Sequence, residues 1–355
     1  MRRLPVFLVI DVSESMVGTG LSQLAEALGA MASALRRDPY VLETAHVSVI
    51  VFAGRVRTLS PLVDVASWRP PELVVGGGTS LGAALMHLMN EIDRQVIRAT
   101  PEQRGDWRPL VFLVTDGRPT DDLTAATQRW NRLYRGGSQL VAVSIGGCAD
   151  HAALLRLTDD VVIFDDSLPG AYGKFANWIS ASIQGQCRSV SSGVDQRVSL
   201  AKAEMDAVAA ATIDDDGGQS PADERYVVLV GRCEKTRLPY LIKFHKHGGR
   251  VNTTNPDVIE LARTKPYILE TAVAVGEGYS ELTDSNESPD RISTDLLIGQ
   301  PPCPHCNVPF SMAECGDCGG ILCVAGAGRH ECPWCGSVCQ YELTAEDFDG
   351  DRGSG

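Results

Sequence analysis

The sequence predicts an α/β protein, with a central, mostly parallel sheet covered by helices on both faces, followed by a small α+β module and a cysteine-rich segment. From residue 1 to about 185, short apolar runs alternate with helical patterns, as in strands joined by crossover helices. Eight of the eleven cysteines lie between Cys303 and Cys339. We therefore expect a first domain at 1–185, a linker at 186–223, a strand module at 224–300 and a cysteine-rich domain at 301–345.

The predicted elements of the first domain follow from the spacing of apolar residues. Leu4–Ile10 is an unbroken apolar run, which suits a strand buried on both faces of a parallel sheet. A helix follows, with one apolar stripe formed by Leu24, Leu28, Met31 and Leu35. Further strands are predicted at 46–53, 55–62, 110–114, 140–145 and 161–164, the first two as an antiparallel hairpin at the sheet edge.

The composition changes between about 188 and 223, where serine-rich and acidic stretches are typical of exposed connections. An alanine-rich stretch at 198–211 within this linker has the composition of a helix. Beyond it, 226–230, 238–244 and 267–275 are predicted strands of a small α+β module.

Three separate segments place polar side chains just after apolar runs. Asp11 ends the first predicted strand, Asp116 follows the run at 110–114, and Thr79 follows three glycines before a helical pattern. Open α/β sheets bind ligands at the carboxyl ends of their strands, so the two carboxylates should meet in one crevice. Neighbouring carboxylates repel, and a divalent cation between them removes that conflict. We therefore predict a metal site there.

The hydroxyls of Ser13, Ser15 and Thr79 would complete this site with hard oxygen donors. Mg²⁺ is favoured over soft metals, with Mn²⁺ or Ca²⁺ as alternatives. Taken singly, each segment has an ordinary interpretation, since Ser and Asp cap helices and Thr-Asp-Gly forms turns. The order of all three segments at successive strand ends is what favours a metal site.

The pattern Asp11-x-Ser13-x-Ser15, followed by Thr79 and Asp116, resembles the metal-ion-dependent adhesion site (MIDAS) of von Willebrand factor A (VWA) domains. More narrowly, 38–40, 47–50, 76–82 and 114–117 resemble TerY-like proteins of tellurium-resistance and stress gene clusters. The resemblance covers about 1–185, and the cysteine-rich tail extends it. It implies a Rossmann-like VWA domain whose five residues surround one Mg²⁺ and leave at least one coordination position for water or a partner's carboxylate.

The tail carries enough thiols for two tetrahedral zinc sites of four cysteines each. The candidate ligands are Cys303, Cys306, Cys315, Cys318, Cys323, Cys332, Cys335 and Cys339. One division puts 303, 306, 332 and 335 on one ion as a zinc ribbon and the other four on a second ion. The sequential division assigns the first four of these cysteines to one ion. His330 is an alternative ligand in either scheme. The tail predicts one or two structural zinc ions.

The net charge and the hydropathy argue against two classes of protein, nucleic-acid binders and membrane-spanning proteins. The formal net charge of −13 argues against sequence-independent binding to nucleic acid, which depends on clustered Lys and Arg. No apolar stretch approaches the ~20 residues that span a bilayer. The apolar start lacks a cleavage site after it and is read as a strand rather than a secretion signal, so we expect a cytoplasmic protein.

These features favour a non-enzymatic adaptor that binds a partner protein through the Mg²⁺ site. The TerY-like resemblance implies, as partner, a protein kinase, a protein phosphatase of the 2C class, or a substrate of either. One alternative is a Mg²⁺-dependent phosphohydrolase, although Ser13 stands where a haloacid-dehalogenase-like enzyme needs a second Asp. A further alternative is a nucleic-acid-binding zinc ribbon, although Arg329 is the lone Lys or Arg between Cys303 and Cys339.

Overall fold

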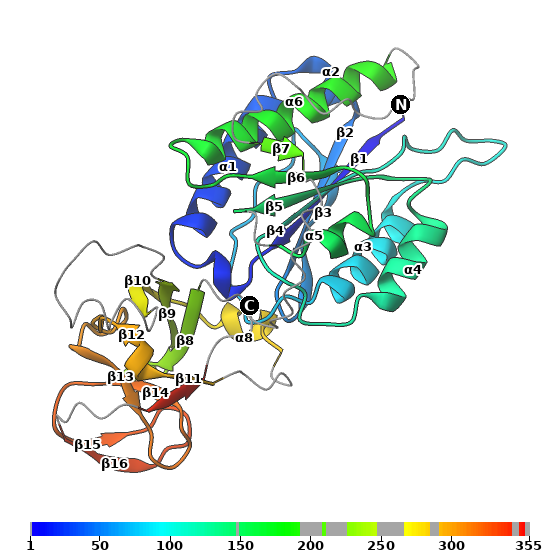
Figure 1. Cartoon of the computed structure of the whole chain (residues 1–355). Helices are drawn as coiled ribbons and strands as arrows, with labels where there is room; N and C mark the ends of the chain where they lie inside the picture. The colour runs from blue at the N-terminus through cyan, green and yellow to red at the C-terminus, as the bar shows by residue number, and fades with distance from the viewer. Residues whose placement is uncertain are drawn as a thin grey trace, which may run out of the picture. The chain divides into compact units, whose positions relative to one another are not determined.

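The computed structural model describes residues 2–146, 149–191, 208–210, 226–246, 266–284, 291–342 and 348–351 (Figure 1). The chain forms two compact units. The first consists of residues 1–73 and 79–219, and the second of residues 74–78 and 220–355.

The first unit is built on a seven-stranded sheet with the order β3-β2-β1-β4-β5-β6-β7. The five central strands run parallel, while β3 and β7 pair antiparallel at the two edges. The pairing of β2 with β3 confirms the predicted edge hairpin. The strands are β1 Leu4–Asp11, β2 Ala45–Phe52, β3 Val56–Asp64, β4 Leu110–Thr115, β5 Gln139–Ile145, β6 Val161–Phe164 and β7 Val208–Ala210.

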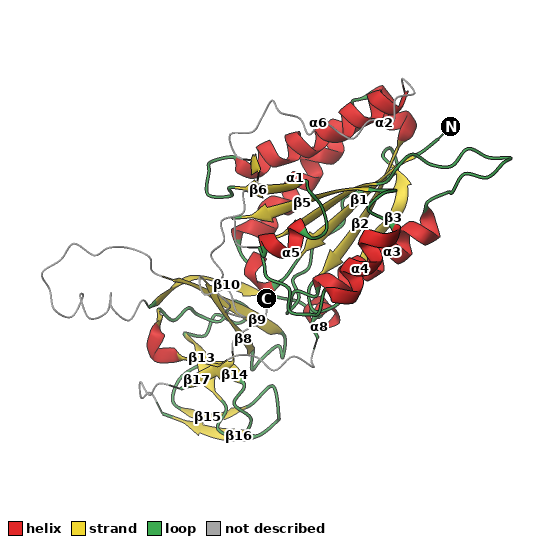
Figure 2. Ribbon diagram, turned by 45° about the vertical axis from the view of Figure 1, so that its right-hand side comes forward, coloured by secondary structure: helices red, strands yellow, loops and turns green. Residues whose placement is uncertain are grey.

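Helices cover both faces of this sheet, with α1, α2 and α6 on one side and α3 and α4 on the other (Figures 1 and 2). The predicted α/β class is therefore confirmed. The helices are α1 Thr19–Leu35, α2 Pro39–Thr44, α3 Leu81–Gln95, α4 Thr124–Leu133, α5 His151–Leu155 and α6 Ala171–Ser191, and a short 3₁₀ helix spans Glu14–Met16.

The core explains why the central strands read as unbroken apolar runs. On one face, Leu85 of α3 and Trp130 of α4 pack in a buried cluster with side chains of β1, β2, β4 and β5. On the other face, Trp178 of α6 packs edge-on against Phe112 of β4, with ring centroids 6.0 Å apart, and stacks on Phe175. Each central strand thus buries apolar side chains on both sides.

The second unit joins segments that the sequence assigns to two separate domains. Strands β8, β9, β10 and β12 from 224–300 and β13 and β14 from 301–345 form one six-stranded sheet, in the order β12-β10-β9-β8-β14-β13. The junction is the parallel pairing of β8 with β14. The sheet strands are β8 Tyr226–Arg232, β9 Pro239–Lys246, β10 Tyr267–Ala274, β12 Leu297–Ile298, β13 Phe310–Glu314 and β14 Ile321–Val324.

Smaller elements complete this unit. Two further pairs of antiparallel strands, β11 with β17 and β15 with β16, stand outside the six-stranded sheet. The bounds are α8 Gly278–Leu282, β11 Arg291–Ser293, a 3₁₀ helix Thr294–Leu296, β15 Gly328–Glu331, β16 Val338–Tyr341 and β17 Asp349–Asp351.

The predicted linker is partly structured. Helix α6 extends into it as far as Ser191, and 208–210 add strand β7 to the first sheet. The other residues of the predicted 198–211 helix lie outside the described residues. Within the part of the chain that is described, no helix combines the length and apolar character needed to cross a bilayer.

Candidate metal sites

The first candidate site is built where β1 and β4 end side by side. Asp11 is the last residue of β1, and only 1% of its surface is exposed. One carboxylate oxygen accepts a hydrogen bond from the Ser13 backbone N–H at 2.9 Å, and the other accepts from the Thr115 hydroxyl at 2.5 Å. The turn after β1 and the end of β4 therefore both fix the orientation of this carboxylate.

The other predicted residues converge on the same edge of the sheet. The Ser13 and Ser15 hydroxyls lie 2.9 Å apart, and the Ser15 hydroxyl donates to a carboxylate oxygen of Asp116 at 2.8 Å. Gly117 shows where Thr79 lies relative to Asp11. A Cβ added to Gly117 would lie 3.2 Å from the Thr79 hydroxyl oxygen and 3.7 Å from an Asp11 carboxylate oxygen. The structure thus brings together all five side chains that the sequence singles out.

Two observations show that these residues fit a hard divalent cation. Thr79 is 1% exposed, and among the described residues its hydroxyl oxygen finds no hydrogen-bond partner. Leaving a buried hydroxyl unsatisfied is costly, and a coordinated ion would satisfy its lone pairs. Burial raises the pKa of Asp11 to about 6, partly offset by the hydrogen bonds from Thr115 and Ser13. A cation would favour the ionised carboxylate.

Seven of the cysteines lie in four turns with the same hydrogen bonds, whereas Cys323 and Cys339 lie in strands β14 and β16. In each turn the first cysteine's N–H donates to the carbonyl five residues later, and its carbonyl accepts from the N–H four residues later. The residue at that fourth position has a positive φ in every turn, 58° for Arg237 and 60° for Asn307 among them. These knuckle turns span 233–238, 303–308, 315–320 and 332–337.

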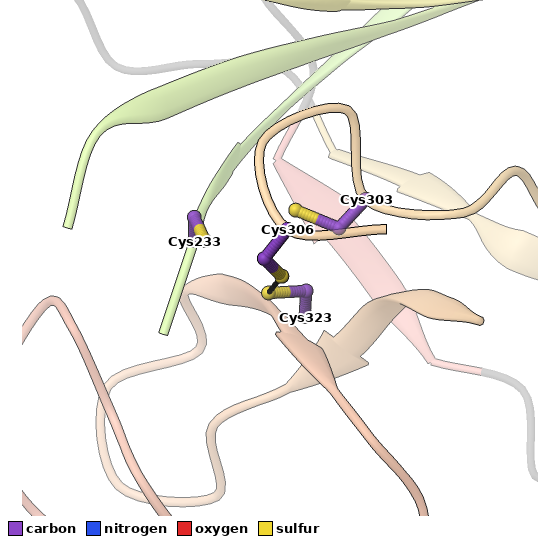
Figure 3. Close-up of side chains that lie close together, drawn as sticks. All are labelled: Cys233, Cys303, Cys306 and Cys323. Atoms are coloured by element: carbon purple, nitrogen blue, oxygen red, sulfur yellow. Dashed lines mark hydrogen bonds between the residues drawn. The ribbon is translucent and has the colours of Figure 1, made fainter. Parts of the chain in front are cut away.

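The first cysteine group consists of Cys233, Cys303, Cys306 and Cys323, whose sulfur atoms all lie within 4.8 Å of one another (Figure 3). Its geometry follows from the sheet. Parallel pairing sets Arg232 of β8 opposite Leu322 of β14, so the next residues, Cys233 and Cys323, lie side by side. The Cys303 turn supplies the other two thiols, and Cys306 Sγ is 3.7 Å from Cys323 Sγ. Four thiols at this spacing suit one tetrahedral zinc ion.

Hydrogen bonds favour the thiolate form of one member of this group. Burial would raise the pKa of the Cys233 thiol, but hydrogen bonds from the Thr236 side chain and backbone lower it to about 6. The Glu234 backbone N–H also donates to Cys323 Sγ at 3.3 Å. Metal binding requires the thiolate, which these contacts favour at Cys233, whereas burial raises the pKa of Cys303 and of Cys323.

The second group consists of Cys315, Cys318, Cys332 and Cys335, again with sulfur atoms within 4.8 Å of one another. Two knuckle turns face each other, and Cys318 Sγ lies 3.7 Å from Cys332 Sγ. Hydrogen bonds from the Ser337 side chain and backbone lower the pKa of Cys335 to about 6. This group is more exposed than the first, because Cys318 and Cys335 both reach the surface.

Both groupings differ from the divisions considered from sequence. Cys303 and Cys306 join Cys233 and Cys323 instead of Cys332 and Cys335, because their turn packs in the hydrophobic cluster of the six-stranded sheet. Cys339 lies 3.9 Å from Cys315 but outside the four-thiol groups found among the described residues. His330 is engaged at both ring nitrogens, by Glu234 at 2.9 Å and by the Gly326 carbonyl at 3.0 Å. His330 therefore does not act as a ligand in either four-thiol group.

Sequence reasoning missed Cys233, although a signal was present. The stretch from Cys233 to Leu238-Pro239-Tyr240 has the same spacing as that from Cys303 to Val308-Pro309-Phe310. Thr236 stands where Cys306 would be, which hides the repeat from a search for Cys-x-x-Cys pairs. Thr115 was also missed as the hydrogen-bond donor to Asp11, although it lies inside the Thr-Asp-Gly motif.

The fold and the first site define a domain class. Residues 6–167 match the family model of the von Willebrand factor type A domain, so this part of the chain is a VWA domain. Residues 223–355 match the family model of the TerY-C metal binding domain, which contains both cysteine groups. The chain therefore combines a VWA domain with a TerY-C metal binding domain.

Several solved structures are similar to this chain. A von Willebrand factor type A protein from Catenulispora acidiphila is 20% identical, with a TM-score of 0.39, over 52% of this chain and 43% of that one. Proximal thread matrix protein 1 from the mussel byssus is 15% identical, with a TM-score of 0.39, over 51% and 48%. The ArnB paralog VWA2 from Sulfolobus acidocaldarius is 10% identical, with a TM-score of 0.36, over 99% and 66%.

The chain spans less than half the length of the first two of these proteins. A further structure of the mussel protein is described as having a zinc-occupied MIDAS motif. No curated protein matches the chain.

Proposed function

We propose that this protein is a non-enzymatic adaptor that binds a partner protein through a Mg²⁺ ion held by Asp11, Ser13, Ser15, Thr79 and Asp116. The observation that carries the proposal is the buried Thr79 hydroxyl, which is unsatisfied among the described residues and, like an Asp11 carboxylate oxygen, lies within 4 Å of the place that a Cβ on Gly117 would take. Oxygen donors of this kind suit Mg²⁺, with Mn²⁺ or Ca²⁺ as alternatives. When bound, the ion would supply a Lewis-acidic position for a carboxylate of the partner.

The protein's own residues set up this docking point. The hydroxyls of Ser13 and Ser15 form a chain of hydrogen bonds that ends on Asp116, so the turn after β1 and the loop after β4 are linked without the ion. The side chains are therefore largely preorganised, which reduces the entropic cost of binding. By resemblance to TerY-like proteins, we infer that the partner is a Ser/Thr kinase, a 2C-class phosphatase or a substrate of either.

We further propose that the TerY-C domain binds two zinc ions, one in each four-thiol group, and that both ions are structural. Each group already supplies four thiols, which leaves no ligand position for a reacting water. Free thiols arranged as metal ligands also suit a reducing compartment, and we place the protein in the cytoplasm. The zinc domain then serves as a second contact surface of the adaptor.

A phosphohydrolase remains the competing function because an Asp at a strand end with Mg²⁺ also suits phosphoryl transfer. The neighbourhood of Asp11 favours the adaptor. Ser13 occupies the position two residues on, where an acid would be needed, and its hydroxyl contacts Ser15. Asp11 itself is buried and held at both oxygens, which restricts an in-line attack on phosphate.

The test is a pull-down with the full chain as bait, in Mg²⁺ and in chelator, comparing the parent with Asp11→Ala and Thr79→Ala. A matched control is Asp165→Asn, because Asp165 also follows a strand but is exposed and hydrogen-bonded to Ser167. We expect the same partner to be lost in chelator and in both site variants and kept in the control. Partner capture that ignores Mg²⁺ and both substitutions would contradict the proposal. Asp11-dependent phosphatase turnover would replace it with the enzyme.

A further inference from the structure

Thr79 is held in place by the loop that follows Asp116. The Thr79 backbone N–H donates to the Thr120 hydroxyl at 3.1 Å, and the Thr120 backbone N–H donates to the Thr79 carbonyl at 3.0 Å. These reciprocal bonds connect the residue that begins the α3 segment with the loop after β4. Two of the proposed metal ligands, Thr79 and Asp116, therefore belong to segments that are tied together only a few residues from each ligand.

The same loop supplies the cap of helix α3. Ser80 occupies the N-cap position, but its hydroxyl donates to the Gly54 carbonyl and makes no cap bond. Asp121 takes over this role, with one carboxylate oxygen accepting from the Gly82 N–H at 2.9 Å and the other from the Ala83 N–H at 2.8 Å. A carboxylate at a helix N-terminus is favoured by the helix dipole and satisfies free N–H groups.

The fit between this loop and α3 is close. A Cβ on Gly82 would come within 2.8 Å of the Asp122 carbonyl and 2.9 Å of an Asp121 carboxylate oxygen. The absence of a side chain at Gly82 thus allows the 120–122 backbone to lie against the first turn of α3. The start of α3 and the 116–122 loop are consequently packed as one piece.

We propose that Thr120 and Asp121 are positioning residues of the metal site, which fix the Thr79 hydroxyl relative to Asp116. This inference rests on the proposed Mg²⁺ site. Neither residue is among the five ligands. Both act through the backbone of Thr79 and of the first turn of α3, and they leave the Thr79 hydroxyl free to face the ion. Residues that orient metal ligands typically change metal affinity by about 10- to 100-fold when they are removed.

The chain provides a matched control for each residue. Thr120→Val removes the hydroxyl with little change in shape, whereas Thr120→Ser keeps it. Asp121→Asn turns one accepting oxygen into an amide that faces a backbone N–H. Asp122 is adjacent and also accepts from a backbone N–H at the start of a helix, that of Thr124 at 2.9 Å, but that helix is α4. Asp122→Asn therefore makes the same chemical change on a helix that carries no proposed ligand.

The experiment measures Mg²⁺ binding to the full chain by titration calorimetry with MgCl₂, and thermal unfolding of the same variants in chelator. We expect Thr120→Val and Asp121→Asn to weaken Mg²⁺ binding about tenfold or more, and Thr120→Ser and Asp122→Asn to bind as the parent does. The free energy of Mg²⁺ binding should fall by more than the free energy of unfolding in chelator does. A purely structural cap would not produce this difference.

The possible failures are distinguishable. If the parent binds Mg²⁺, Asp11→Ala does not, and Thr120→Val and Asp121→Asn bind as the parent does, the positioning role is wrong and the metal site stands. If all four variants weaken binding equally, the effect is not specific to Thr79 and the inference is overturned. If the parent binds no Mg²⁺, the proposed function itself fails and the inference falls with it.

Discussion

A Cys233→Ser variant should lose one zinc ion, whereas Cys339→Ser should keep both. In the structure Cys233 belongs to the first four-thiol group, and Cys339 lies outside the four-thiol groups found among the described residues. The zinc-ribbon division drawn from sequence gives the opposite result, because there Cys339 is a ligand and Cys233 is spare. The two substitutions are chemically identical, so together they decide between the two ligand sets.

The magnitude follows from the number of ligands. Structural zinc contributes about 10–16 kcal/mol of binding free energy. Shared evenly among four thiolates, this is roughly 2.5–4 kcal/mol for each, so replacing Cys233 should weaken zinc binding at this group about 70- to 1,000-fold. Cys233 is fully buried in the hydrophobic cluster of the six-stranded sheet, together with Cys303 and Cys323. Loss of the ion would therefore also destabilise the sheet.

The assay is the zinc content of the purified full chain, measured by mass spectrometry of the metal or by a chromogenic chelator, with hydrogen exchange of residues 226–246 as a second readout. We expect close to two zinc ions per chain in the parent and in Cys339→Ser and close to one in Cys233→Ser, with faster exchange in β8 and β9. Full zinc in Cys233→Ser together with loss in Cys339→Ser would refute the grouping.

Three further predictions concern the same two units. A strong zinc chelator should unfold the TerY-C domain, because the ~10–16 kcal/mol of zinc-binding free energy is as large as the typical stability of a domain, about 5–15 kcal/mol. Circular dichroism and hydrogen exchange would check this. A domain that stays folded would exclude structural zinc. Gly117→Ala should weaken Mg²⁺ binding about tenfold by calorimetry, since the added Cβ would lie 3.2 Å from the Thr79 hydroxyl, and unchanged affinity would contradict the site geometry. Trp178→Ala should lower the free energy of unfolding of the VWA domain by about 3–5 kcal/mol in urea titrations, because the buried ring packs against Phe112 and Phe175, and a loss below about 1 kcal/mol would contradict that packing.

The elements that sequence predicts well are those whose pattern is local. Leu4–Ile10 and 110–114 are apolar because both faces of their strands are buried, and each ends at a polar residue because the sheet ends there. The same alignment of parallel strand ends brings Asp11, Thr115 and Asp116 to one edge of the sheet. The convergence of polar side chains at strand ends can therefore be predicted before any long-range pairing is known.

The candidate zinc ligands could not be divided into their two groups from the sequence, because the grouping depends on which strands pair. Cys233 meets Cys323 through the register of β8 with β14, a parallel contact between segments about ninety residues apart. No local pattern encodes that register. The Cys-x-x-Cys spacing predicts a turn that can bind an ion, but it does not predict which other cysteines complete the site.

A zinc ion in the first cysteine group would also help to join two segments that the sequence assigns to separate domains into one sheet. Strand β14 is only four residues long, and it pairs with β8 over two residue pairs, Ile321 with Gly231 and Leu322 with Arg232. So short a parallel ladder contributes few hydrogen bonds of its own. A zinc ion bound by Cys233 and Cys323 would cross-link the two strands immediately beyond the ladder, and the Cys303 turn would tie in the segment that precedes β13. On this reasoning a bound metal would reinforce the pairing of β8 with β14 that brings the two cysteines together.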